Sequence, residues 1–177
     1  MTRIPLPDPQ QLGGWAREQF DRFPSNLTRT LLVTADERLA GALPATANAL
    51  RASSFSPWLR EAVILRVAAR SGSAYERFHH LGQARVAGWS DEQIDAIERG
   101  DDERLPATIG PVLRLTDAVV AGPTVDDATL SAVRTQLADG DLVTLLILIG
   151  HYLTVGRLTA VLDVDLDPEP DPWAGEH

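Results

Sequence analysis

The sequence predicts an all-α protein with one domain of about eight helices, over residues 14–162. Apolar residues recur three and four positions apart through most of the chain, which is typical of amphipathic helices. Stretches that alternate between apolar and polar residues, as half-buried strands do, are scarce. The 177 residues suit one domain, and 44% hydrophobic with 23% charged residues is ordinary for a globular protein.

Prolines and glycines delimit the predicted helices of the first half. Residues 1–13 are expected to form an extended lead-in marked by prolines. Pro24 ends the first helix, and Gly41 and Pro44 punctuate the second. Ser56 and Pro57 are a favourable helix start, with the proline at the first helical position. The helices predicted here span residues 15–23, 28–43, 45–52 and 57–70.

Glycines and a capping box mark the helices of the second half. Gly72 and Gly88 follow two of them, and Ser90 and Gln93 form a capping box at the start of another. The acidic, proline-containing residues 163–177 are expected to be a mostly disordered tail or a strap along the surface. The helices predicted here span residues 74–87, 91–100, 109–120, 126–137 and 142–162, with a connector at 101–106.

The composition excludes several classes of function. The chain has no cysteine, so it forms no disulfide, thiolate nucleophile or zinc–sulfur site. All 16 basic residues are arginine, which excludes a Schiff-base lysine. The net charge of −9 disfavours nucleic acid as a partner. No glycine motif for nucleotides is present, and no cofactor is expected.

No segment has the character of a signal peptide or a membrane anchor. Residues 1–10 lack an apolar core of signal-peptide length. The most apolar run, residues 142–149, is about half of the length that a bilayer requires. We therefore expect a soluble, cytoplasmic protein that does not bind membranes.

One acidic residue lies on the apolar face of the predicted helix 57–70. At about 100° per residue, Arg60, Arg66 and Arg70 cluster on one side of this helix. Glu61 falls on the other side, among apolar residues. A carboxylate there costs several kcal/mol unless it is paired or protonated. Glu61 therefore has a partner on a neighbouring helix, a chemical role, or partial exposure to solvent.

The next predicted helix carries a carboxylate and an imidazole on one face. Glu76 and His80 are four residues apart, and small residues continue that face, which leaves room for a cavity. A carboxylate raises the pKa of an adjacent imidazole and fixes its tautomer, which suits a general acid or base near neutral pH. The alternative is a surface pair that contributes a few tenths of a kcal/mol.

Two further histidines are less informative. His79 points about 100° away from His80, so at most one of the two is expected to serve a given site. His151 lies in the most apolar helix, where it either lines the same pocket or is a core histidine with a hydrogen-bond partner. Glu61, Glu76 and His80 are a sparse set of metal ligands, so no metal is expected.

This pattern resembles the carboxymuconolactone decarboxylase superfamily, which has an alkylhydroperoxidase-D-like fold. The resemblance rests on Glu61, on Ser73, Glu76 and His80 at family spacing, and on the segment 88–94. The peroxidase branch has cysteines at the positions of Ser73 and Glu76, whereas the decarboxylase branch has a glutamate and a histidine at Glu76 and His80. The chain is similar to a long, cysteine-free subgroup.

The resemblance implies a homo-oligomer, commonly a trimer or hexamer, with the active site near subunit contacts. An excess of apolar surface on the helix 142–162 agrees with this. Peroxide reduction by a cysteine pair is excluded, because the chain has no cysteine.

The main hypothesis is a cofactor-independent, decarboxylase-like lyase that acts on a small organic acid or lactone. His80 would be the general acid, Glu76 would orient it, and Glu61 would support it from the facing helix. Arg77 is a candidate clamp for a substrate carboxylate, although it lies off the face of Glu76. The residues assigned to substrate binding are Ser73, Tyr75, Arg77, His79 and His151.

Two other functions would use the same residues. An isomerase or cyclase would move a proton through His80 and a glutamate without loss of CO2. A non-catalytic oligomeric binding protein would keep Glu61 and His80 as a structural pair. The effect of His80→Asn on turnover and on stability distinguishes catalysis from a structural role.

Overall fold

The structure, a computed structural model, describes residues 2–170 and confirms the all-α fold. Within that range it contains nine α-helices, two short 3-10 helices and no strand. The α-helices are α1 (Gly14–Arg22), α2 (Asn26–Leu32), α3 (Glu37–Ala52), α4 (Pro57–Ser71), α5 (Ala74–Val86), α6 (Asp91–Arg99), α7 (Gly110–Ala121), α8 (Asp127–Arg134) and α9 (Asp139–Val161), and the 3-10 helices are Pro9–Gln11 and Asp102–Arg104.

Helix α4 lies at the centre of a bundle formed by the second half of the chain. It packs against α5, α6, α7 and α9. Its residues from Arg60 to Ala68 are all buried, so neighbouring helices cover it on every side. One apolar cluster joins α4 to α7 and α9, and a second joins α4 to α5, α6 and α7.

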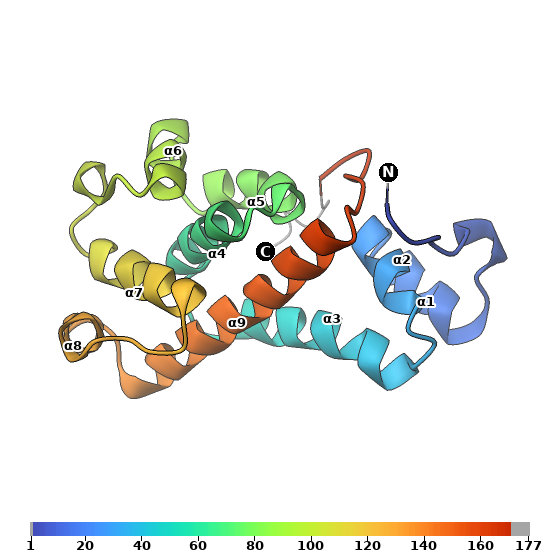
Figure 1. Cartoon of the computed structure of the whole chain (residues 1–177), viewed down its shortest axis with the longest axis horizontal. Coiled ribbons are helices and arrows are strands. Elements are labelled where there is room, and N and C mark those ends of the chain that lie inside the picture. Colours follow the sequence, from blue (N-terminus) through green and yellow to red (C-terminus); the bar gives the residue numbers. More distant parts are fainter. Residues whose placement is uncertain (1, 171–177) are drawn as a thin grey trace.

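Helices α1, α2 and α3 lie beside this bundle (Figure 1). Helix α3 packs against α2 on one side and against α9 on the other. Leu50, in the last turn of α3, and Phe55, just beyond it, enter the core of the bundle. The N-terminal helices are therefore attached to the bundle mainly through α3.

The boundary between α2 and α3 differs from the prediction of one helix over residues 28–43. Ala35 has a positive φ of 55°, and the Asp36 side chain accepts a hydrogen bond of 3.0 Å from the Leu39 amide to begin a new helix. Pro44 does not interrupt α3, which continues for two more turns. Packing of α3 against α2 and α9 outweighs the one hydrogen bond that a proline removes.

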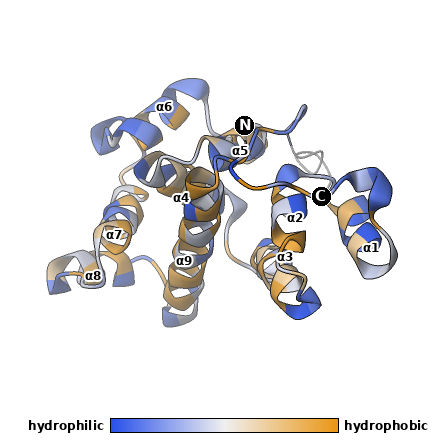
Figure 2. Ribbon diagram, turned by 45° about the vertical axis from the view of Figure 1, so that its right-hand side comes forward, coloured by the Kyte–Doolittle hydropathy of each residue, from blue (hydrophilic) through white to orange (hydrophobic). Residues whose placement is uncertain are grey.

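Helix α9 is a 23-residue apolar helix, as its colouring in Figure 2 shows. By length and composition it could cross a membrane, but 44% of the qualifying stretch is buried inside the protein, and core helices pass the same test. The exposed apolar side chains on the part of α9 nearest its start are Val143, Leu146 and Ile147, at 55%, 40% and 51%.

After α9 the chain returns to the N-terminal helices as a strap, which we define as residues 163–170. The Arg3 amide donates to the Leu162 carbonyl at 2.8 Å, and the Thr2 amide donates to the Asp165 carboxylate at 3.1 Å. The strap thus runs beside the start of the chain. The rest of the predicted tail, residues 171–177, lies outside the described residues.

Candidate functional site

A cavity of about 140 Å³ lies between the N-terminal helices and the bundle. Helices α2 and α3 form one side, and α5 and α9 form the other. Much of the wall is apolar, including Leu27, Leu31 and Val155. The titratable residues that line the cavity are Arg51, Tyr75, Glu76, His79, His80, His151, Tyr152 and Glu169.

Glu61 and His80 form a buried ion pair at this site. His80 Nδ1 lies 2.8 Å from Glu61 Oε2, and Glu61 Oε1 accepts a hydrogen bond of 2.9 Å from Arg60 Nε. Glu61 is 1% exposed, so partial exposure is ruled out, and it has two partners, His80 and Arg60. Arg60 pairs with Glu61, whereas Arg66 and Arg70 pair with acidic residues outside α4.

The ion pair favours the charged form of both partners. Burial raises the pKa of Glu61, but His80 and Arg60 outweigh burial and bring this pKa below its ordinary value. Burial lowers the pKa of His80, but the charges of Glu61 and then Glu76 outweigh burial and raise it. Both shifts favour an imidazolium beside a carboxylate in this site.

Glu76 approaches the other nitrogen of the same imidazole. Its Oε2 lies 3.6 Å from His80 Nε2, which is ion-pair distance but longer than a hydrogen bond. Glu76 lines the cavity and Glu61 does not, so the Nε2 side of His80 is the side nearer the cavity. His80 is thus held tightly at Nδ1 and only loosely at Nε2.

His151 brings a second imidazole to the cavity, from α9. Its Nδ1 is buried and has no hydrogen-bond partner among residues 2–170. Burial, together with the charge of His80, lowers the pKa of His151 to about 4, so this ring is neutral at pH 7. The ring of Tyr152 makes an edge contact with each imidazole, at a centroid distance of 5.0 Å in both cases.

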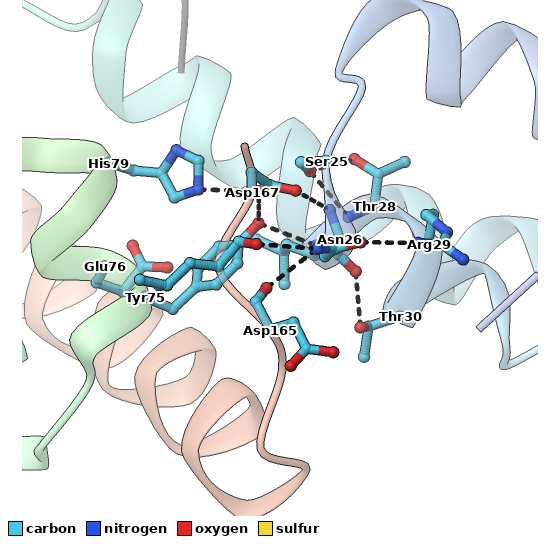
Figure 3. Close-up of polar contacts among 12 residues, drawn as sticks. Ser25, Asn26, Thr28, Arg29, Thr30, Tyr75, Glu76, His79, Asp165 and Asp167 are labelled. Atoms are coloured by element: carbon cyan, nitrogen blue, oxygen red, sulfur yellow. Dashed lines mark hydrogen bonds and ion pairs between the residues drawn. The ribbon is translucent and has the colours of Figure 1, made fainter. Parts of the chain in front are cut away.

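His79 belongs to a second polar cluster, which ties the strap to α2 and α5 (Figure 3). Asp167 accepts a hydrogen bond from the Tyr75 hydroxyl and one of 2.7 Å from the Asn26 amide. Its carboxylate also lies 3.0 Å from His79 Nε2. The Tyr75 hydroxyl accepts one of 3.1 Å from the Leu27 amide. Burial raises the pKa of Asp167, but these hydrogen bonds outweigh burial and lower it.

The structure places the two adjacent histidines in different environments but on one cavity. His79 faces Asp167, whereas His80 faces Glu61. This agrees with the angle of about 100° expected between adjacent side chains of a helix. Both residues nevertheless line the same cavity, together with Tyr75. The prediction that at most one of the two lies at a given site is therefore wrong for the cavity lining.

Two of the predicted substrate-binding residues are not part of the cavity lining. Ser73 caps α5: its Oγ accepts a hydrogen bond of 3.2 Å from the Glu76 amide and lies 3.3 Å from the Thr159 hydroxyl. Arg77 forms an ion pair of 2.6 Å with Glu98, and 47% of its side chain is exposed. Arg77 is therefore not placed to hold a carboxylate in this cavity.

Arg51 and Tyr152 also line the cavity, although neither was among the predicted site residues. The positive charge of Arg51 opposes the protonation of His80 and favours ionisation of Tyr152, so it acts within this site. Arg51 lies in the last turn of α3 and Tyr152 lies in α9, so no local pattern relates them. The position of Tyr152 next to His151 was the one local signal that could have identified Tyr152 as a site residue.

The titratable residues do not converge on a metal centre. Within residues 2–170, no three side chains of His, Asp or Glu lie close enough together to hold a metal ion. The arrangement instead provides a proton donor, a neutral imidazole and a cation around one cavity, which suits proton transfer to a small anion.

No family model matches the chain, and no curated protein matches it. Solved structures share its fold. A protein from Ralstonia eutropha, described as an alkylhydroperoxidase AhpD core and as an uncharacterized peroxidase-related protein, has a TM-score of 0.79 and 18% identity over 94% of this chain and 93% of that one. An uncharacterized peroxidase-related protein from a Silicibacter species has a TM-score of 0.73 and 16% identity, over 94% and 92%.

A third structure is a protein of unknown function from Agrobacterium tumefaciens, named as a candidate antioxidant defence protein AhpD. It has a TM-score of 0.71 and 20% identity, over 78% of this chain and 97% of that one. These likenesses show that the chain has the AhpD-like fold that the family resemblance implies.

Proposed function

We propose that the protein is a cofactor-independent lyase that releases CO2 from a small organic acid or lactone in the cavity. The observation that carries this proposal is the His80 imidazole, which has Glu61 2.8 Å from Nδ1 and Glu76 3.6 Å from Nε2. An imidazolium held in this way is a proton donor at the edge of a small cavity. Thiol peroxidase chemistry is excluded by the lack of cysteine.

The reaction needs a cation for the substrate carboxylate and an acid for the carbon that loses CO2. Arg51 lines the cavity and supplies the cation. As the carbon–carbon bond breaks, its electron pair stays on the remaining carbon as a carbanion or enolate, and CO2 leaves. His80 then gives its Nε2 proton to that carbon and becomes neutral, and a proton from solvent restores the imidazolium.

Glu61 and Glu76 act through His80 and are positioning residues. Glu61 holds the Nδ1 proton and favours the charged imidazole before the transfer. Glu76 lies too far from Nε2 for a hydrogen bond, so it adds negative charge without binding the proton that must leave. This asymmetry supports proton transfer from Nε2 into the cavity.

The test is incubation of the protein with a panel of γ-lactone carboxylates and β-keto carboxylates. The wild type, His80→Asn and the control Glu98→Gln are compared, with CO2 measured by headspace mass spectrometry. Glu98 pairs with Arg77 outside the cavity. We expect the wild type and the control to release CO2, and His80→Asn to be slower by about 100-fold or more.

The mass of the product separates the remaining functions. A product of unchanged mass would indicate an isomerase or cyclase that uses the same residues. No turnover by the wild type, together with a large loss of thermal stability in His80→Asn, would indicate a structural pair in a binding protein. Circular dichroism and the melting temperature of each variant are therefore recorded beside the rates.

A further inference from the structure

His151 is a buried polar group that the proposed proton transfer does not use. The residue is 8% exposed and lines the cavity. Its Nδ1 has no hydrogen-bond partner among residues 2–170. Buried polar atoms in folded proteins nearly always have a partner, because an unpaired one destabilises the fold. Nδ1 is closed to solvent as the ring lies, so a rotation of the ring that turns this nitrogen to the cavity would let a bound molecule supply the partner.

The protonation state of His151 indicates which chemical group that molecule offers. With a pKa of about 4, the imidazole is neutral at pH 7, so one nitrogen donates a hydrogen bond and the other accepts one. A carboxylate only accepts, and binds charged donors best. A hydroxyl both donates and accepts, so it fits either tautomer of a neutral imidazole.

The other walls of the cavity supply a cation and an apolar surface. Arg51 enters from α3, and its positive charge acts on both His80 and Tyr152. Leu27, Leu31 and other apolar residues complete the wall. A ligand that matches these features has a carboxylate, an apolar body and one hydroxyl.

The size of the cavity limits the apolar body. The volume is about 140 Å³. An engineered apolar cavity of about 150 Å³ binds benzene in another protein. The part of the ligand that lies inside the cavity is therefore about the size of one six-membered ring.

We infer that the cavity binds a ring-sized hydroxy acid, whose hydroxyl hydrogen-bonds to His151 and whose carboxylate lies against Arg51. This inference rests on the proposed function for the place of the site, and it deepens that function by naming the substrate class. His151 is then the residue that determines specificity, and His80 remains the proton donor.

The affinities of small aromatic probes test the inference separately from turnover. Isothermal titration calorimetry at neutral pH compares benzoate, the 2-, 3- and 4-hydroxybenzoates, 3-formylbenzoate and phenol. For the wild type, we expect at least one hydroxybenzoate to bind about three- to tenfold more tightly than benzoate, because it adds one hydrogen bond. Phenol, which lacks the carboxylate, should bind at least about tenfold more weakly than that hydroxybenzoate.

Variants separate the two contacts. His151→Phe should bind hydroxybenzoates no more tightly than benzoate, and its affinity for benzoate should stay within about twofold of the wild type. His151→Gln keeps a donor and an acceptor, so it should retain part of the preference for hydroxybenzoates. Arg51→Met should weaken binding of every acid by about tenfold or more. Arg38→Met is the matched control, since Arg38 is an exposed arginine of the same helix outside the cavity lining.

Several results would overturn the inference. The first two are that the wild type binds none of the acids, or that it binds benzoate and all hydroxybenzoates with equal affinity. The others are that the formyl group increases affinity more than the hydroxyl does, or that His151→Phe still binds a hydroxybenzoate more tightly than benzoate. An equal effect of Arg51→Met and Arg38→Met would do the same. If the protein releases CO2 but does not prefer hydroxybenzoates, this inference is wrong and the proposed lyase function stands. If it prefers hydroxybenzoates but releases no CO2, the inference stands and the lyase function is wrong.

Discussion

At the residue scale, Glu61 is the carboxylate that compensates two buried cations, Arg60 and His80. The contribution of Glu61 to stability is present above its ordinary pKa of 4.5 and is lost as the pH falls through its lowered pKa. The contribution of His80 is present below its ordinary pKa of 6.5 and is lost as the pH rises through its raised pKa. The pair therefore stabilises the fold most between these two ordinary values.

Glu61→Gln should lower the pKa of His80 and destabilise the protein by about 3 kcal/mol near pH 6, because it leaves buried cations without a carboxylate. The measurements are urea unfolding and NMR titration of the His80 imidazole. Glu98→Gln is the control, since it breaks a partly exposed ion pair and should cost at most about 1 kcal/mol. An unchanged pKa of His80 would contradict the proposed role of Glu61.

The lowered pKa of His151 predicts a loss of stability in acid. Protonation is disfavoured in the folded protein, so stability should fall as the pH drops from 6.5 toward the folded pKa of about 4, by about 3 kcal/mol in total. His151→Phe should lack this component. The test is the difference in unfolding free energy between wild type and variant at several pH values. A difference that does not change with pH would show that His151 is not held neutral by burial.

At the element scale, the strap holds α2 in place. Asp167 accepts a hydrogen bond from the Asn26 amide in the first turn of α2, and the Asp165 carbonyl accepts one of 3.1 Å from the Asn26 side chain. Asp167 also contacts Tyr75 and His79 of α5. This short segment thus couples the two helices that face each other across the cavity.

Asp167→Ala should destabilise the protein by about 2 kcal/mol, because it leaves buried donors unpaired. Hydrogen exchange of the α2 amides should become faster, while that of α7 is unchanged, since the hydrogen bonds of Asp167 reach α2 and α5. Asp139→Ala, at a carboxylate that is 83% exposed, is the control and should change stability by less than about 0.5 kcal/mol. Uniform faster exchange in all helices would contradict a local role.

At the scale of the whole molecule, α9 has a core face and an exposed apolar face. Val143, Leu146 and Ile147 form the exposed face, on the side of the helix away from the bundle core. Contiguous apolar surface is typical of sites that another protein covers. We propose that a second copy of the chain covers it, in the trimer or hexamer that the family resemblance implies.

Ile147→Asp should therefore shift the protein to a smaller species, because it places a charge in the subunit contact. The measurement is size-exclusion chromatography with light scattering over a range of concentrations. Val86→Asp is the control, since Val86 is an equally exposed apolar residue, at 58%, on α5. A monomeric wild type, or an equal effect of both substitutions, would contradict the proposal.

The sequence by itself determined the all-α class, most helix boundaries and the exclusion of thiol and Schiff-base chemistry. These properties are local or compositional: helical periodicity, caps such as Ser90, and the lack of cysteine and lysine are visible without a fold. Helical spacing also placed Glu76 and His80 on one face, and it left a partner, a chemical role or partial exposure open for Glu61.

The tertiary structure decided the rest. Whether Pro44 breaks a helix depended on what packs around α3, and periodicity does not contain that information. Arg51, His151 and Asp167 reach the cavity region from segments that are far apart in the chain, so no spacing could relate them. The orphan Nδ1 of His151 likewise arises from burial by several elements at once, because burial is a property of the packed molecule and not of one helix.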